Sequence, residues 1–177
     1  MTDMTSAPAA AAPVAAPSAL AGLGITAIIV VAVVLWAVVG TALFSEATLF
    51  GAFLLLWHWA NLEQLDIKRL PAVLGGALVG IALAWQVVYL TQTMGTNGTI
   101  LGLLIMVAGI YLQVINVLPF LFNTSAMLFL TVAAAPLIQL KVDFAELALS
   151  TVVGGLLFGA FVEAVKWIAA KAMPGAA

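Results

Sequence analysis

Two ionisable side chains stand inside otherwise apolar stretches of the sequence, where a charge is costly and can serve chemistry. His58 lies in LWHWAN, between two tryptophans, and Glu163 lies in FVEAVKW near the end of the chain. Carboxylates within membrane-length apolar segments are often functional, and an imidazole gains or loses its proton near neutral pH. A His58–Glu163 pair at one membrane face can therefore gate the passage of a solute or couple it to protons.

Each of these two residues also has a simpler interpretation. Tryptophans favour the membrane–water interface, so His58 fits an interfacial aromatic belt. Lys166 follows Glu163 by three residues, and a helical pair of this spacing can extend its charged ends to the interface. Both interpretations of both residues stay open from the sequence.

Short polar runs interrupt the hydrophobic sequence at two places, at Ser45-Glu46 and at the run 123–125. Such side chains accept hydrogen bonds from free N–H groups at helix N-termini, which also carry partial positive charge. At membrane depth, interrupted helices are tolerated where they are buried in protein or line a wet cavity. The runs predict either ordinary interfacial caps or a polar constriction for a small neutral or anionic solute. The candidate residues lining such a pathway are Ser45, Glu46, Asn116, Asn123, Thr124 and Ser125.

Composition excludes most other chemistry. The chain has no cysteine and one histidine, which leaves no ligand set for a cysteine- or histidine-based metal site. It has no nucleophile–base pair, phosphate-binding loop or dinucleotide fingerprint, so we expect neither an enzyme nor a cofactor. A net charge of −2 without a basic cluster argues against nucleic acid as a partner.

The elements that carry these residues belong in a lipid bilayer. Of the 177 residues, 66% are hydrophobic and 7% are charged, and the mean hydropathy is +1.27. Soluble domains have about a quarter of their residues charged, whereas a membrane-spanning helix needs about 20 mostly apolar residues. After an Ala/Pro-rich tail (1–19), which we expect to be flexible, six hydrophobic segments follow at about 20–44, 48–60, 71–90, 99–118, 119–140 and 144–172.

Two of the six segments are irregular. Segment 48–60 has thirteen residues, which is short for a crossing, and segment 119–140 is interrupted by its polar run and by Pro136. The polar stretch 91–98 predicts a turn, with Asn97-Gly98 as the turn pair. The sequence therefore predicts an all-α polytopic membrane protein with a single transmembrane domain over 20–173.

One cassette occurs twice. VLGGALVG at 73–80 returns as VVGGLLFG at 152–159, an offset of 79 residues (73 to 152), and the same offset places SEATLFGA (45–52) on TSAMLFLT (124–131). Self-similarity at a fixed period indicates internal duplication. The two repeats would cover about 20–90 and 99–172. With three crossings each, the second must enter the membrane inverted, as in many transporters.

Glycines recur within the cassette at a spacing of four residues, which puts each pair on one helical face. These are Gly76 and Gly80 in the first copy and Gly155 and Gly159 in the second. Small residues at this spacing let helix backbones approach closely in lipid. The faces therefore predict either packing between the two halves or surfaces on which a partner protein docks.

The basic residues predict how the chain is oriented. Lys and Arg near helix ends favour the cytoplasmic side. With six crossings, Lys68-Arg69 falls on the same side as Lys166 and Lys171, whereas Lys141 falls on the other side. Both termini are then cytoplasmic. If segments 48–60 and 119–140 only re-enter the membrane, four crossings remain and the charge bias weakens.

Four motifs, LFGAFLLLWHWANLEQL, LPAVLGGALVG, LPFLFNTSAMLF and VVGGLLFGA, occur in this order over about residues 25–170. Their order resembles a family of small bacterial inner-membrane proteins of unknown function, which implies a location in the bacterial inner membrane. We predict a small-solute channel or transporter whose pathway lies between two inverted repeats. A homo-oligomer or a complex with another membrane protein is expected. The alternative is a non-transporting accessory subunit of a larger membrane complex.

Overall fold

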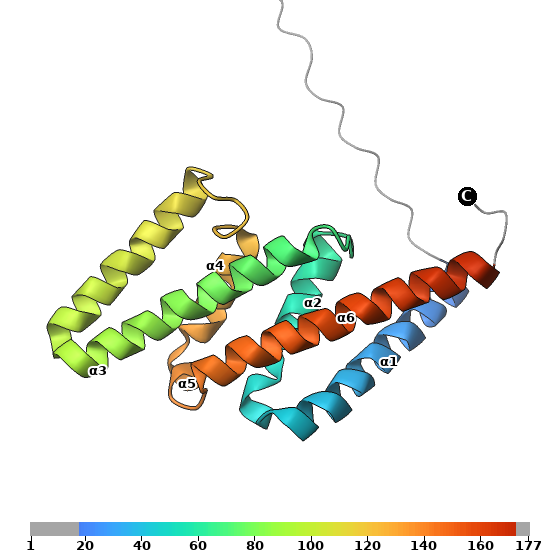
Figure 1. Cartoon of the computed structure of the whole chain (residues 1–177), viewed down its shortest axis with the longest axis horizontal. Helices are drawn as coiled ribbons and strands as arrows, with labels where there is room; N and C mark the ends of the chain where they lie inside the picture. Colours follow the sequence, from blue (N-terminus) through green and yellow to red (C-terminus); the bar gives the residue numbers. More distant parts are fainter. Residues whose placement is uncertain (1–17, 173–177) are drawn as a thin grey trace, which may run out of the picture.

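The computed structural model describes residues 18–172, which form helices with no β-strand among them (Figure 1). The all-α prediction is thus confirmed for this part of the chain, whereas positions 1–17 of the predicted tail lie outside the described residues. The elements are α1 (Ala19–Leu43), the 3-10 helix η1 (Glu46–Thr48), α2 (Phe50–Leu62), α3 (Leu70–Val114), α4 (Thr124–Ala133), α5 (Pro136–Gln139) and α6 (Phe144–Ala172).

Three of these helices are long and apolar enough to cross a membrane. They are α1 over Gly22–Leu43, α3 and α6. Much of their surface consists of exposed Ile, Val and Leu side chains, which only a lipid or protein environment covers favourably. A membrane location follows from these three helices.

Helix α3 is a hairpin of two helical arms, 70–94 and 96–114, joined at Gly95 (Figure 1). Gly95 has φ +60° and ψ −138°, a conformation that L side chains rarely adopt. Across the hairpin, the Gln86 amide donates to the Gly102 carbonyl at 2.8 Å. The predicted turn within 91–98 is thus confirmed, but it lies at Gly95 and not at the predicted pair Asn97-Gly98. Gly98 serves a different purpose, because it lies directly against the backbone of the first arm at Leu90.

The chain from Ser45 to Leu65, which contains α2, runs in the same direction as α6 and is inclined to it (Figure 1). At one end, the Ser45 hydroxyl donates to the Glu146 carboxylate at 2.8 Å, and at the other end the Lys166 ammonium group donates to the Leu65 carbonyl at 3.0 Å. Both contacts join residues 101 positions apart. At a rise of about 1.5 Å per residue, the stretch of α6 between them is about 30 Å long. The chain from Ser45 to Leu65 thus contacts α6 at two points about 30 Å apart along that helix.

Helix α4 packs in the same way against the first arm of α3. The Ser125 hydroxyl donates to the Val73 carbonyl at 2.8 Å, and further along both helices Gly80 lies against Ala126 and Leu130. These contacts advance together along the chain, so α4 is parallel to this arm.

The first arm of α3 crosses α6 in the antiparallel sense. Leu70 lies against Gly159 and Leu74 lies against Gly155, so the contacts move in opposite directions along the two helices. Helix α1 is held against this group by Trp36, which is fully buried. The centroid of its indole ring lies 6.1 Å from the centroid of the Phe158 ring. Its N–H donates to the Leu49 carbonyl at 3.2 Å.

Candidate functional site

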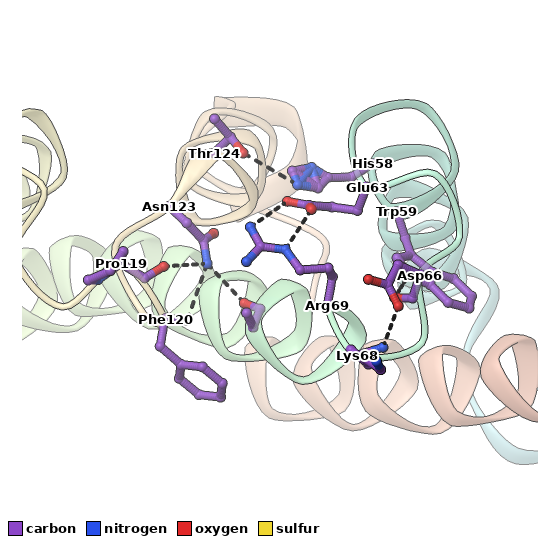
Figure 2. A network of polar contacts seen from close by, with 11 residues as sticks. His58, Trp59, Glu63, Asp66, Lys68, Arg69, Pro119, Phe120, Asn123 and Thr124 are labelled. Atoms are coloured by element: carbon purple, nitrogen blue, oxygen red, sulfur yellow. Dashed lines mark hydrogen bonds and ion pairs between the residues drawn. The ribbon is translucent and has the colours of Figure 1, made fainter.

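A polar cluster lies where the C-terminal end of α2 meets the N-terminal end of α4 (Figure 2). The His58 side chain is 1% exposed, and its Nε2 lies 3.5 Å from the Thr124 hydroxyl oxygen. Its other ring nitrogen, Nδ1, is buried without a hydrogen-bond partner. Thr124 is exposed, so the pair joins a buried imidazole to a hydroxyl at the protein surface.

An ion pair stands beside this cluster in the connection between α2 and α3 (Figure 2). The Arg69 guanidinium donates to the Glu63 carboxylate at 2.8 Å. This hydrogen bond, with the charge of the same carboxylate, raises the pKa of Arg69 above its ordinary value, so the guanidinium remains charged. The connection is also held against α2, because the indole N–H of Trp59 on this helix donates to the Asp66 carbonyl at 2.8 Å.

Asn123 caps α4 and anchors it to α3. Its side-chain oxygen accepts a hydrogen bond from the Ala126 N–H at 3.2 Å, as expected of an Asn at the N-cap position. Its amide group donates to the Ala72 carbonyl at 2.9 Å and, at longer distances, to the carbonyls of Pro119 and Phe120 (Figure 2). Asn123 and the buried Ser125 are thus turned toward protein backbone, and Thr124 is the exposed member of the polar run.

The other polar break lies at the opposite end of α2. Ser45 binds the Glu146 carboxylate through both its hydroxyl and its backbone N–H. The buried Ser150 hydroxyl donates to the Thr48 carbonyl at 2.7 Å, which ties η1 to α6. Glu46 is exposed next to this contact.

The structure thus separates the predicted pathway residues into two groups. Asn123, Thr124 and Ser125 lie at the His58 end of α2, whereas Ser45 and Glu46 lie at its start. Asn116 belongs to neither of these two groups. It is exposed in the connection from α3 to α4, in a left-handed backbone conformation with φ +56°.

The two residues of the predicted gating pair have different partners. Glu163 is exposed and pairs with Lys166 at 2.9 Å, whereas His58 contacts Thr124. Lys166 also contacts Leu65, which joins the basic end of α6 to the charged connection 63–69.

Sequence reasoning overlooked Glu146, Thr48 and Ser150, which form the contacts at the start of α2. Glu146 offered one signal, because a carboxylate in the first turn of a helix is favourable and marks an N-terminus. Nothing in the sequence indicates that its partner is Ser45. The predicted packing glycines all lie against side chains or backbone of another element: Gly76 against Asn123, Gly80 against Ala126, Gly155 against Leu55 and Leu74, and Gly159 against Ile67 and Leu70.

The polar cluster offers hydrogen bonds and one ion pair, without a group of acidic or histidine side chains that could hold a metal ion within residues 18–172. Comparisons of the chain with protein-family models, with curated proteins and with solved structures found no match. The resemblance to small bacterial inner-membrane proteins therefore stays a prediction.

Proposed function

We propose that the protein is a channel or transporter for a small neutral or anionic solute in the bacterial inner membrane. Its pathway would follow α2, between two inverted three-helix halves, with polar groups at each end. The first half contains α1, α2 and the first arm of α3, and the second contains the second arm, α4 and α6.

This proposal rests on the packing of the two short helices, because each of them lies against a long helix of the other half. Helix α2 runs in the same direction as α6 of the second half, and α4 lies parallel to the first arm of α3 in the first half. An offset of 79 residues places α6 on the first arm of α3, and it places the segment 45–52, at the start of α2, on residues 124–131 of α4. Such reciprocity supports a duplicated and inverted chain, and transporters of this construction bind their substrates between the repeats.

The polarity of α2 supports the course of the pathway. Thr48 meets Ser150 just before the helix, and His58 meets Thr124 near its end, so both ends form polar contacts with the second half. Between them, Leu55 is fully buried and lies near Gly155. In this arrangement an apolar side chain closes the middle of the route, and the hydrogen-bonding groups stand on either side of it.

The proposal predicts a specific effect of Thr124→Val on solute flux. We expect vesicles that contain the protein to admit urea, glycerol or acetate faster than empty vesicles, as measured by stopped-flow light scattering. Thr124→Val should slow this flux about three- to tenfold, since the lost hydrogen bond contributes about 0.5–1.5 kcal/mol. The matched control is Thr131→Val, which changes an exposed hydroxyl on the same helix that bonds only within α4.

Three outcomes would count against parts of this proposal. If folded, reconstituted protein admits none of the three solutes faster than empty vesicles, the proposed function fails. Equal slowing of the solute flux by both threonine variants would mean that the polar cluster at Thr124 is not part of the route. Stoichiometric co-purification of a membrane partner, together with absence of flux, would favour the accessory-subunit function.

The six crossings have a direct test, because the chain contains no cysteine. Lys68→Cys and Lys141→Cys should react with a membrane-impermeant maleimide from opposite faces of the membrane. With six crossings the two positions are separated by three of them, whereas re-entrant segments at α2 and α4 would place both on one face. Labelling intact spheroplasts and inverted vesicles in parallel distinguishes the arrangements, and labelling of both cysteines from one face contradicts the inverted repeat.

A further inference from the structure

A cavity of about 450 Å³ lies between α1, α2 and α6, away from the polar cluster. Helix α1 contributes Ile25, Ile29 and Val33, and the opposite walls include Leu56 and Phe161. Asn61 is the single lining residue with a polar side chain other than the indole of Trp57. The cavity is therefore an apolar space among helices that belong in a membrane.

The anchoring of α1 explains why this space exists. Trp36 packs between α1 and α6, where Gly40 and Gly154 leave room for its ring. N-terminal to Trp36, the bulky rings of Phe53 and Phe158 stand between the helices and line the cavity with α1. Close contact of α1 with its neighbours is therefore concentrated at Trp36 and at Ala32, one turn before it, whereas the lining residues Ile25, Ile28 and Ile29 are exposed.

An apolar space of this kind must be filled by an apolar group. Water does not occupy a cavity without several polar partners. A helix of a second protein chain is about 10–12 Å across with its side chains. A linear hydrocarbon chain is thinner and fits the volume.

The charge at one end of the cavity indicates what the hydrocarbon belongs to. Leu65 lines this end, and the Lys166 ammonium group lies 3.0 Å from its carbonyl oxygen. An ammonium group has three N–H donors, and the contacts with Leu65 and Glu163 use two of them. Lys171 lies further along the same helix, over the Trp167 ring. Glu163 offsets one of these two positive charges, and the remaining charge together with the third N–H donor of Lys166 complements a phosphate.

We propose that the cavity binds one acyl chain of a membrane phospholipid, with the phosphate of its headgroup beside Lys166. The bound lipid completes the contact of α1 with α2 and α6, and it does so whether or not the protein transports a solute. The site is distinct from the proposed pathway, because its lining residues include none of the predicted pathway residues and neither Thr48 nor His58.

Native mass spectrometry of the full-length protein, released from phosphatidylglycerol nanodiscs, tests this site. We expect one phospholipid to remain bound. Ile29→Trp places a large ring in the cavity and should lower the bound fraction about tenfold, the effect of losing about two buried methylene groups. The matched control is Val31→Trp, because both residues are more than half exposed on α1 but Val31 does not line the cavity.

The other occupants predict different results. Equal lipid retention by Ile29→Trp and Val31→Trp overturns the site. A dimer that Ile29→Trp dissociates, without a bound lipid, assigns the cavity to a second copy of the chain. Release of the parent protein without any bound lipid overturns the phospholipid. A Lys166→Gln variant that retains phosphatidylglycerol as well as the parent protein does overturns the placement of the phosphate.

Discussion

Gly80→Ala is expected to destabilise the protein, whereas Gly159→Ala is expected to leave it unchanged or slightly more stable. The two glycines are equivalent in the repeated cassette, but their neighbours differ. A methyl group at Gly80 would meet the backbone of α4, at the Ala126 carbonyl and at the Leu130 nitrogen 2.8 Å away. Backbone cannot move aside without shifting the helix, so we expect the cost of overpacking, about 1–3 kcal/mol.

The methyl group at Gly159 would meet the end of a flexible side chain, Leu70 Cδ2, at 2.7 Å. Rotation of that side chain relieves the contact. Alanine also favours the helix over glycine by about 0.8–1.0 kcal/mol, which offsets the remaining strain. The sign of the effect therefore differs between two positions that the sequence makes equivalent.

Unfolding by SDS in mixed micelles, followed by circular dichroism, measures both free energies. Gly24→Ala is the reference, because no other atom lies within 4 Å of the position that its new methyl group would occupy. Equal destabilisation at Gly80 and Gly159 would mean that α4 is not packed against the backbone of α3 as described.

The helical segments follow from the sequence because length and apolar composition are local properties. The last hydrophobic segment was predicted at 144–172, and α6 has these bounds. The position of the hairpin turn does not follow so directly. Asn97-Gly98 has the stronger local turn signal, but Gly98 is required where the two arms touch, and only Gly95 is left to adopt a positive φ. Tertiary contact therefore decides between two glycines that local preference cannot separate.

The candidate site was predictable in its residue types but not in its pairings. The polar runs around Ser45 and Thr124 stand out against an apolar background. Their partners lie 101 residues away at Glu146 and 66 residues away at His58, and such distances depend on how the helices pack. The same reason explains why His58 and Glu163, which were predicted to pair, have different partners. The sequence placed both residues at one membrane face without information about which side of each helix they occupy.

Trp36→Ala is expected to cause the largest loss of stability among substitutions in α1. The ring is fully buried, it packs on Phe158, and its N–H donates to the Leu49 carbonyl. Removing a buried aromatic side chain of this size costs about 3–5 kcal/mol. The matched substitution, Trp167→Ala, removes a ring that is 60% exposed, and exposed positions change stability by about 0.5 kcal/mol or less.

This substitution also separates the anchoring of α1 from the binding of lipid. Without Trp36, α1 loses its main contact with α6, so the cavity loses a wall and both unfolding free energy and lipid retention should fall. Ile29→Trp fills the same cavity while Trp36 stays in place, so it should lower lipid retention and leave most of the stability intact. If Trp36→Ala lowers stability but retains the lipid, α1 is not a wall of the lipid site, because a cavity that needs α1 cannot survive its release.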